Sequence, residues 1–327
     1  MLHAQRLRRG RAMIKSVVKT SVGLAAPRVP QLRAELERSL SVFLYHDVSD
    51  APAPFSLDCH LAVSVRQFER QLAFIAETFN VISIDELLTG RVPQRAALIT
   101  FDDGVAGIFQ HALPALRRVG LPSIIFLNMA PVLGEPFWAA RAVYLCRHTE
   151  GFLPWLTERV GRRALDSPHL ACTPALVEEW ERAHGDHDLK ALPRYLGKFA
   201  TPDDLEEADR DPLVTFGNHL YRHYNILNLS DAELEAEFRS DAEALSSYRG
   251  SRPVLAFPFG HGVSDRHVSL LLGWGLKRLF TGISSLNRDP AAPILHRVSL
   301  TSWHDRPSRM WFQIARAAIE SGAMRAR

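Results

Sequence analysis

The stretch that decides the fold is Ala96-Ala-Leu-Ile-Thr-Phe-Asp-Asp-Gly104. Its first six residues form an apolar run without alternation, which is typical of a strand buried on both faces of a parallel sheet. Two adjacent carboxylates, Asp102 and Asp103, follow where this strand ends. In parallel α/β folds the active site lies beyond the carboxyl ends of the strands. The segment therefore predicts a site at this strand end, with a solvated acidic turn as the alternative.

Strand-like runs and helical periods alternate on both sides of this segment. Four apolar residues between positions 68 and 79 recur at helical spacing, and the sequence SDAE at 230–233 has the pattern of a capping box that opens a helix. The other expected strands are residues 41–45, 81–84, 123–127, 254–257, 279–283 and 294–300, and a helix at 310–319 closes the chain. Repeated βα units of this kind predict an α/β fold, either a barrel or a doubly wound sheet.

Residues 131–213 interrupt the alternation. They contain helical segments around 137–146, 174–184 and 189–199, separated by Pro, Gly and charged residues, and they show no convincing strand. We interpret them as a helical insertion in a barrel-like unit that covers residues 41–327. Residues 1–40 form a basic N-terminal segment in front of it.

Composition and charge narrow the class of protein. The chain has 327 residues, of which 46% are hydrophobic and 23% charged, and these values exclude disordered, collagenous and coiled-coil proteins. A net charge of +3 gives no global basic excess, so nucleic acid is not an expected partner. Three widely spaced cysteines without a CxxC motif favour a reducing compartment, and we expect a cytoplasmic protein.

The one local excess of charge lies at the start of the chain. Residues 1–20 carry six basic side chains and no acidic one. This pattern is compatible with peripheral contact to an anionic membrane surface, and a solvated terminus is the simpler alternative.

A second motif is His219-Leu-Tyr-Arg-His223, with two histidines four positions apart. This spacing brings two imidazoles to one face of a helix or of a tight helical loop, as in other paired-histidine zinc sites. In a chain with 14 histidines such a pair also arises by chance. Together with Asp102-Asp103 it would supply two nitrogen ligands and one oxygen ligand for an open metal site. Because neighbouring side chains at a strand end point in opposite directions, one carboxylate can bind the cation while the other reaches the activated water.

These motifs, followed by AFPFG at residues 256–260, stand in the order and separation found in one known family. The chain resembles the polysaccharide deacetylases, carbohydrate esterases that remove N-acetyl groups from chitin, peptidoglycan and exopolysaccharides. The resemblance runs from about residue 42 to residue 298. The opening FLYHDVSD and the segment ALPALRRVGLPSIIFL are most similar to the bacterial members associated with surface-polysaccharide synthesis. The resemblance implies a distorted (β/α) barrel.

The resemblance also implies roles for individual residues. In the family's TFDDG motif the first Asp is the catalytic base and the second is a metal ligand, which gives Asp102 and Asp103 here. The family's histidine motif gives His219 and His223 as the other ligands of a divalent metal, usually Zn²⁺. His296 is the candidate for the general acid that protonates the leaving amine.

Several positions depart from the family pattern. Leu220 stands where a Ser or Thr normally follows the first metal histidine and stabilises the loop. The segment AFPFG lacks the Arg that normally orients the catalytic Asp, and the usual fourth motif is not recognisable. Next to His296, Arg297 is the feature more typical of the surface-polysaccharide branch.

Four further residues are expected to contact the substrate. His46 follows the first strand and is a candidate for substrate contact, with a packed histidine as the alternative. Tyr221 and Phe259 are candidates for an apolar wall against the acetyl methyl group or the sugar face. A backbone N–H near Phe259 or Gly260 is a candidate for stabilising the oxyanion.

The predicted function is a metal-dependent hydrolase that removes N-acetyl groups from sugars of a polysaccharide or glycan precursor. The expected partner is therefore an N-acetylated glycan. A catalytically weak glycan-binding module on the same barrel and an O-acetyl esterase are the alternatives. The sequence makes no prediction of the oligomeric state.

Overall fold

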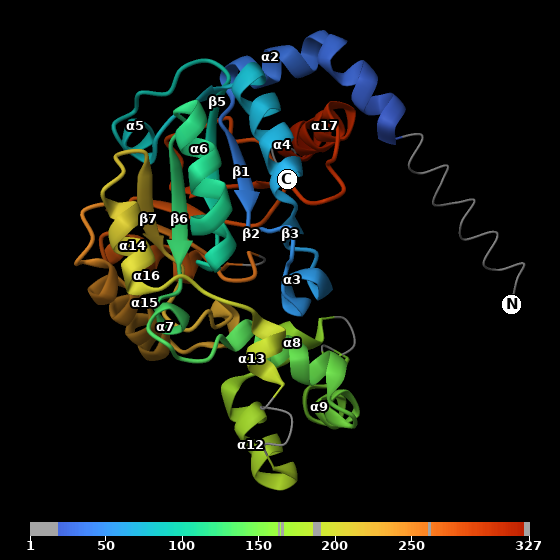
Figure 1. Ribbon diagram of the computed structural model, residues 1–327, viewed down its shortest axis with the longest axis vertical. Helices are drawn as coiled ribbons and strands as arrows, with labels where there is room; N and C mark the ends of the chain where they lie inside the picture. Colours follow the sequence, from blue (N-terminus) through green and yellow to red (C-terminus); the bar gives the residue numbers. More distant parts are fainter. Residues whose placement is uncertain (1–18, 163, 165–166, 186–190, 261–262, 324–327) are drawn as a thin grey trace, which may run out of the picture.

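The computed structural model describes residues 19–162, 164, 167–185, 191–260 and 263–323. Its centre is one parallel sheet with helices around it (Figure 1). The strands of this sheet are β1 Ser41–Tyr45, β4 Asn80–Val81, β5 Ala96–Phe101, β6 Ser123–Leu127, β7 Val214–Asn218, β8 Ser251–Ala256, β9 Arg278–Phe280, β10 Ile294–Leu295 and β11 Val298–Ser299. They pair in the order β10-β9-β8-β7-β6-β5-β1-β11, and β4 also pairs with β5. A separate parallel pair joins β2 Asp47–Val48 to β3 Ala62–Val63.

The strand order shows that the sheet curls. Strands β10 and β11 are separated by only two residues of chain, yet they lie at opposite ends of the order. The sheet must therefore bend round until its two edges nearly meet, with residues 296 and 297 between them. This confirms the predicted distorted barrel. The expected single strand at 294–300 is instead two short strands that serve the two edges.

Alternation along the strands separates the barrel interior from the helix-covered face. Val42, Leu98 and Ile124 belong to one apolar cluster, and their chain neighbours Phe43 and Ile99 belong to another that includes the surrounding helices. Asp102 stands four positions after Leu98, and residues an even number of positions apart in a strand lie on the same face, so its side chain points to the interior. This register carries Asp102 into the barrel.

Helices follow most strands and cover the outer face. Outside residues 129–196 the described helices are η1 Ala26–Arg28, α2 Pro30–Arg38, α3 Pro54–Asp58, α4 Val65–Thr78, α5 Ile84–Leu88, η2 Ile108–Ala112, α6 Leu113–Val119, α14 Pro202–Asp209, η4 Ile226–Asn228, α15 Asp231–Leu245, α16 Asp265–Gly273 and α17 Pro307–Ala323. The capping box at the start of α15 is present as predicted. The expected strand at 81–84 is wrong beyond Val81, because Ser83 and Glu86 form a second capping box that starts α5.

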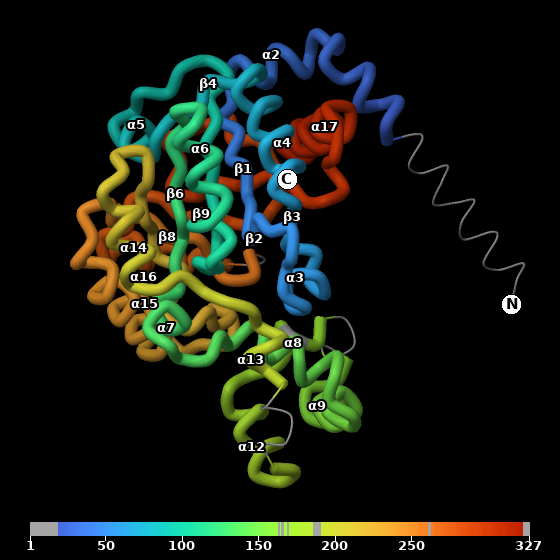
Figure 2. The backbone as a smooth tube through the Cα atoms, viewed as in Figure 1, coloured from blue at the N-terminus to red at the C-terminus, as the bar shows by residue number. Residues whose placement is uncertain are grey.

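The stretch 131–213 is helical as expected. It contains the end of α7 Met129–Val132, then α8 Trp138–His148, α9 Phe152–Val160, α11 Pro168–Ala171, α12 Pro174–His184, α13 Leu192–Leu196 and α14. In Figures 1 and 2 most of these helices lie below the sheet, on the side toward which the strand arrows of Figure 1 point. They have an apolar cluster of their own, built on Trp138, Phe152, Leu156 and Trp180. The limits of this insertion as a unit stay a prediction.

The N-terminal segment is described from residue 19. Residues 19–25 are helical, and Leu32 and Leu36 of α2 are buried in the same cluster as Phe43 of the sheet. The domain boundary at residue 40 stays a prediction. Most of the basic segment 1–20 lies outside the described residues. Among the described helices, none has the length and apolar character that a membrane crossing requires.

Candidate metal centre and active site

Asp102 extends from the end of β5 into the barrel and meets Arg297. The Arg297 guanidinium donates to Asp102 Oδ1 at 2.6 Å and to Oδ2 at 2.8 Å, and both side chains are buried. Arg297 Nε also donates to the carbonyl of Thr281, which fixes the guanidinium plane. Burial alone would raise the pKa of Asp102, but Arg297, together with His219 and His46, outweighs it and lowers that pKa. Asp102 is therefore an ionised carboxylate at neutral pH.

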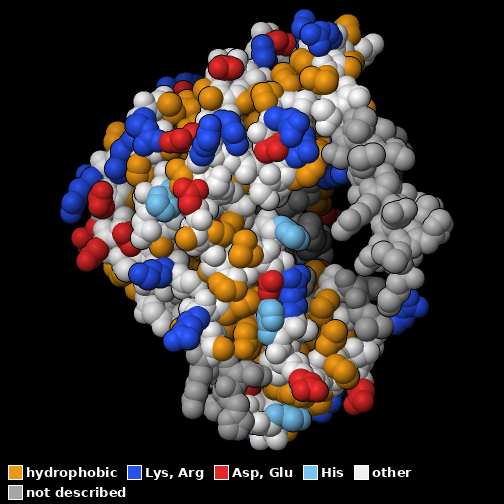
Figure 3. All heavy atoms as spheres, turned by 45° about the vertical axis from the view of Figure 1, so that its right-hand side comes forward, with side chains coloured by type: hydrophobic (Ala, Val, Ile, Leu, Met, Phe, Trp, Pro, Cys, Tyr) orange, Lys and Arg blue, Asp and Glu red, His pale blue; other side chains and the backbone are white. Residues whose placement is uncertain are grey.

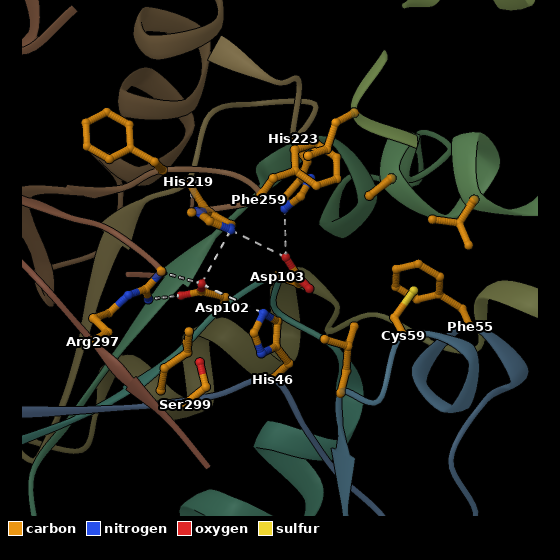
Figure 4. Close-up of a pocket in the computed structure, with 18 residues that line it drawn as sticks. His46, Phe55, Cys59, Asp102, Asp103, His219, His223, Phe259, Arg297 and Ser299 are labelled. Carbon is orange, nitrogen blue, oxygen red and sulfur yellow. Dashed lines mark hydrogen bonds and ion pairs between the residues drawn. The ribbon is translucent and has the colours of Figure 1, made fainter. Parts of the chain in front are cut away.

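Asp103 points to a different place from its neighbour because the chain turns sharply at this residue. Its φ is 73°, in the left-handed region, and Gly104 follows with φ 78°. This turn directs Asp103 Oδ1 toward His223 Nε2 at 3.2 Å and His219 Nε2 at 3.5 Å (Figure 4). Burial alone would raise the pKa of Asp103, but the two imidazoles hold it well below its usual range. The two neighbouring carboxylates thus have different main partners, Arg297 for Asp102 and His223 for Asp103. His219 Nε2 lies near both, 3.5 Å from Asp103 Oδ1 and 3.8 Å from Asp102 Oδ2.

The two histidines lie in the loop after β7, which the sequence did not predict as a strand. His219 Nδ1 contacts the carbonyl of Ala256 at 2.7 Å, so Nε2 is turned toward the carboxylates. The segment is not helical: Leu220 and His223 have φ values of 59° and 61°. The two histidines therefore meet in a tight turn with left-handed residues, and of the two expected arrangements the helix is wrong. Burial alone lowers the pKa of both imidazoles, but the adjacent carboxylates raise that of His219.

The side chains of Asp103, His219 and His223 fit a metal ion. One ligand atom from each lies within 4.8 Å of the others, and all three residues are buried. Asp103 Oδ1 lies near the two imidazole Nε2 atoms but makes no well-aligned hydrogen bond to any described residue. A buried carboxylate oxygen without a hydrogen bond is unfavourable, and a cation facing it would remove that cost. One oxygen and two imidazole nitrogens are a common ligand set for zinc, with further positions left open for catalysis.

A cavity of about 300 Å³ opens beside this cluster. One wall is polar and carries His46, Asp102, Asp103, His219, His223, Arg297 and Ser299. The opposite wall is mostly apolar and comes from α3 and from the insertion, with Phe55, Cys59, Leu61, Ala139, Val143 and Leu170. Figure 4 shows this division, with Phe55 and Cys59 across the cavity from Arg297. The insertion thus forms part of the site.

Most of the predicted site residues lie at this cavity. His46, Phe259 and Gly260 line it, and His46 Nε2 lies 4.0 Å from Asp102 Oδ2. The ring of Phe259 packs edge-on against His223, with a centroid separation of 4.7 Å. The N–H of Gly260 donates to the carbonyl of Phe257, so it is engaged within its own turn.

Two predicted residues are not among those that line the cavity. The Tyr221 hydroxyl donates to Glu135 at 3.0 Å, away from the metal cluster. The Nδ1 of His296 lies 2.8 Å from the Thr281 hydroxyl. Burial lowers the pKa of His296. Neither residue meets the other candidates in this structure.

Several lining residues were not predicted as site residues. Ser299 lies on β11, beyond Arg297, where the carboxyl ends of the strands meet. Phe55, Val143 and Leu170 lie on helices whose sequence indicates only ordinary amphipathic packing. No local motif identifies them, because their place at the cavity depends on how the insertion folds back over the strands.

The fold and this cluster define a class: a barrel hydrolase with an Asp-His-His metal site and an ionised carboxylate beside it. Comparison with known proteins agrees, because the family model "Polysaccharide deacetylase" matches residues 89–278, more than half of the chain. The chain belongs to this family. It is a deacetylase that removes acetyl groups from polysaccharides, and the family is metal-dependent. No sequence among the curated proteins matches the chain closely enough to count as a relative.

Solved structures share the fold. IcaB from Ammonifex degensii superposes with a TM-score of 0.56 at 20% identity, covering 84% of this chain and 97% of that one. The Streptococcus pyogenes deacetylase PplD, in complex with acetate, gives 0.56 at 13% identity, with 84% and 98% covered. A de-N-acetylase from Aggregatibacter actinomycetemcomitans gives 0.55 at 16% identity, with 84% and 99% covered. These likenesses support the barrel seen here.

Proposed function

We propose that the protein removes N-acetyl groups from a glycan at the cavity beside Asp103, His219 and His223. One observation carries this proposal: an ionised carboxylate, held by Arg297, lies next to a three-ligand metal cluster in the same cavity. A metal cluster alone could be structural. A second, separately anchored carboxylate beside it is what a hydrolytic site requires.

We infer that Asp103, His219 and His223 would hold the metal, and that the metal is Zn²⁺. Two imidazole nitrogens and one carboxylate oxygen favour zinc over magnesium or calcium, which prefer oxygen ligands. When bound, a divalent ion of this kind lowers the pKa of a bound water to about 7 and polarises an acyl carbonyl. His219 keeps its Nε2 available because its Nδ1 is engaged by Ala256.

Asp102 is assigned as the base that accepts the proton of the attacking water. Its carboxylate is ionised, and the two hydrogen bonds from Arg297 fix the plane of the carboxylate. The oxygen that accepts the proton therefore has a defined orientation. We assign protonation of the leaving amine to His46 rather than to His296. His46 lines the cavity and lies 4.0 Å from Asp102, whereas His296 Nδ1 contacts Thr281 outside it.

The substrate class rests on chemistry and on the names of similar structures. Phe259 and the apolar wall of α3 and α8 suit an acetyl methyl group or the face of a sugar ring. Among the structurally similar proteins, one is named a de-N-acetylase and another was solved with acetate. We therefore propose an N-acetylated glycan of the exopolysaccharide type as substrate, and acetate and a free amino sugar as products.

Acetate release from matched N-acetylated and O-acetylated oligosaccharides tests the function. We expect release from the N-acetylated substrate, loss of it on treatment with a chelator, and recovery on adding Zn²⁺. Release from the O-acetylated substrate alone would favour the esterase. Tight glycan binding with no acetate release from either substrate would favour the binding module.

We further propose that residues 1–20 contact an anionic membrane surface from a reducing, cytoplasmic compartment. All three cysteines are free thiols. The charge of residues 1–20 is complementary to anionic lipid, at ~1 kcal/mol for each cation near the surface. Next to this segment, Val22, Leu24 and Val29 are exposed apolar residues, and Ile319 of α17 is 73% exposed. At the upper end of the molecule in Figure 3, at the height of α2, apolar and basic side chains lie together with acidic ones among them.

Cosedimentation with vesicles tests this contact. We expect the full chain to bind vesicles of phosphatidylcholine with phosphatidylserine at low salt, and to bind pure phosphatidylcholine much less. Deleting residues 1–20 should remove the difference while acetate release is retained. Equal binding of the full and shortened chains would indicate a solvated terminus.

A further inference from the structure

The loop that carries both histidines lacks the hydroxyl residue that normally stabilises it. Leu220 takes that position, and its side chain is fully buried in an apolar cluster with Leu255 and Phe257. Leu220 and His223 nevertheless both have left-handed backbone conformations. Such conformations are unfavourable for residues with a Cβ and persist only when the surroundings hold them. Something other than residue 220 must therefore hold the loop.

Two asparagines that end neighbouring strands contact the loop backbone. Asn128 follows β6, and its Nδ2 donates to the carbonyls of His219 at 2.5 Å and Leu220 at 2.6 Å. The amide must face the loop with its nitrogen, because its oxygen would meet two acceptors. Asn218 ends β7, and its Oδ1 accepts from the N–H of Leu220 at 2.9 Å.

A buried carboxyl group on α15, that of Asp241, contacts the backbone of both strand ends. Asp241 Oδ1 accepts from the N–H of Met129 at 2.9 Å, next to Asn128. Asp241 Oδ2 shares the N–H of His219, at 3.3 Å, with the carbonyl of Leu127 at 3.0 Å. Asn128 and Asp241 are both fully buried, and neither lines the cavity. One carboxyl group thus ties the end of β6 to the end of β7 at the first metal histidine.

We propose that Asn128 and Asp241 are positioning residues for the metal cluster, acting through the backbone of His219 and Leu220. They touch neither substrate nor metal. Asn128 donates to two carbonyls beyond the strand ladder, of which that of Leu220 also accepts from the N–H of His223 at 3.4 Å, and Asp241 sets where the turn begins. The imidazole of His219 then reaches Asp103 only when this backbone is in place. This inference rests on the proposed metal site.

Zinc affinity measured by chelator competition tests the inference, together with the absorption spectrum of the Co²⁺-loaded protein. Removing outer partners of a metal site typically weakens binding 10–100-fold. We expect Asn128→Ala to raise the zinc dissociation constant by on the order of 10–100-fold and to change the Co²⁺ spectrum. Asp241→Asn keeps one acceptor oxygen and should weaken zinc binding to a smaller degree. This second variant tests the inference if Asn128→Ala does not fold.

Matched controls separate positioning from general stability. Asn287 is also buried, and its Nδ2 likewise donates to two carbonyls, those of Leu40 and His296. Asp209 likewise accepts from two backbone N–H groups, those of Arg249 and Gly250. Asn287→Ala and Asp209→Asn should lower the melting temperature but leave zinc affinity and the Co²⁺ spectrum unchanged.

Two results would overturn the inference, and both differ from the result that would disprove the proposed metal site. Unchanged zinc affinity in folded Asn128→Ala and Asp241→Asn, while His219→Ala loses zinc, would show that the two residues are only structural. An equal loss of affinity in the Asn287→Ala control would show that any buried defect has this effect. If His219→Ala itself kept its zinc, the proposed metal site would be wrong.

Discussion

Arg297 holds both oxygens of Asp102, with hydrogen bonds of 2.6 and 2.8 Å from its two terminal nitrogens. The pair joins positions that are 195 residues apart in the chain. Arg297 lies between β10 and β11, where the two edges of the curled sheet approach each other. The closure of the barrel and the orientation of the carboxylate therefore depend on the same residue. The arginine missing from the AFPFG segment has its counterpart here, in the two-residue connection between β10 and β11.

Arg297→Lys tests whether this two-point contact matters for the rate. Lysine keeps the positive charge but cannot hold both oxygens, so the carboxylate plane becomes free to rotate. We expect kcat/KM for acetate release to fall by on the order of 10–100-fold, with KM little changed. Metal content should stay at the wild-type value, because Arg297 contacts none of the three ligands.

Arg288→Lys is the matched control for this change. Arg288 also pairs with a buried carboxylate through two nitrogens, that of Glu35, but on the far side of the fold. The Arg288→Lys substitution should lower the free energy of unfolding and leave kcat unchanged. Similar kcat values in the Arg297→Lys and Arg288→Lys enzymes would contradict a role for Arg297 in positioning the base.

Asp102→Asn should separate the base from the metal ligands. We expect metal content near wild type and a rate lower by on the order of 10²–10⁴, the usual contribution of a positioned base. From the sequence the change looks nearly isosteric and harmless to the fold. The structure predicts otherwise: it leaves the Arg297 guanidinium buried without a carboxylate, a loss of about 3–5 kcal/mol in unfolding free energy.

Combining Asp102→Asn with Arg297→Gln removes the unpaired charge. Chemical denaturation should show that the double variant regains part of the lost stability, while acetate release stays low. Metal loss in Asp102→Asn as large as in Asp103→Asn would mean that both carboxylates are ligands and that the base lies elsewhere, with His46 the next candidate.

The central strands could be predicted because their composition leaves little choice. The run AALITF has no polar face, so it must be covered on both sides, and β1 and β6 are equally apolar and fully buried. Asp102 and Asp103 could be found for the same reason, since carboxylates directly after such a strand need partners. β7 was missed because its sequence, VTFGN, contains a Gly and two polar residues and so lacks the pattern of a strand.

The partners of these residues could not be predicted. His296 and Arg297 are adjacent, and only the break between β10 and β11 decides which side chain enters the barrel. The sequence offered His296 as a candidate acid beside Arg297, and in the structure its Nδ1 lies against the Thr281 hydroxyl. The histidine loop posed a similar problem: HxxxH has the same spacing in a helix and in an irregular turn, and Leu220 gives no sign of a left-handed conformation.

Replacing both metal histidines tests the ligand set directly. With His219 and His223 changed to Ala, only Asp103 remains of three ligands, which is too few for a catalytic zinc site. We expect elemental analysis of the wild-type protein to find about one zinc per chain, and of the double variant to find nearly none. Unchanged metal in the double variant would show that these histidines only pack in the loop.

His304 gives a prediction for stability far from the site. Its ring is buried near α4 and α17, and its Nδ1 accepts from the N–H of Thr301 at 2.9 Å. Burial, helped by Arg316 and Arg309, lowers the pKa of His304 to about 4. An unfolded chain has its histidine pKa near 6.5, so between these values the unfolded state binds a proton that the folded state does not.

The sign of the effect follows from that difference. The contribution of His304 to the free energy of unfolding is fully present above pH 6.5 and is lost as the pH falls toward about 4. The loss from this one group amounts to about 2 kcal/mol at pH 5. His304→Gln cannot take up the proton, and its side-chain oxygen can still accept from Thr301. Urea unfolding from pH 5 to pH 7.5 should therefore show a shallower loss of stability on acidification in the variant than in the wild type. If the two proteins lose stability in parallel over this range, His304 is not the group responsible.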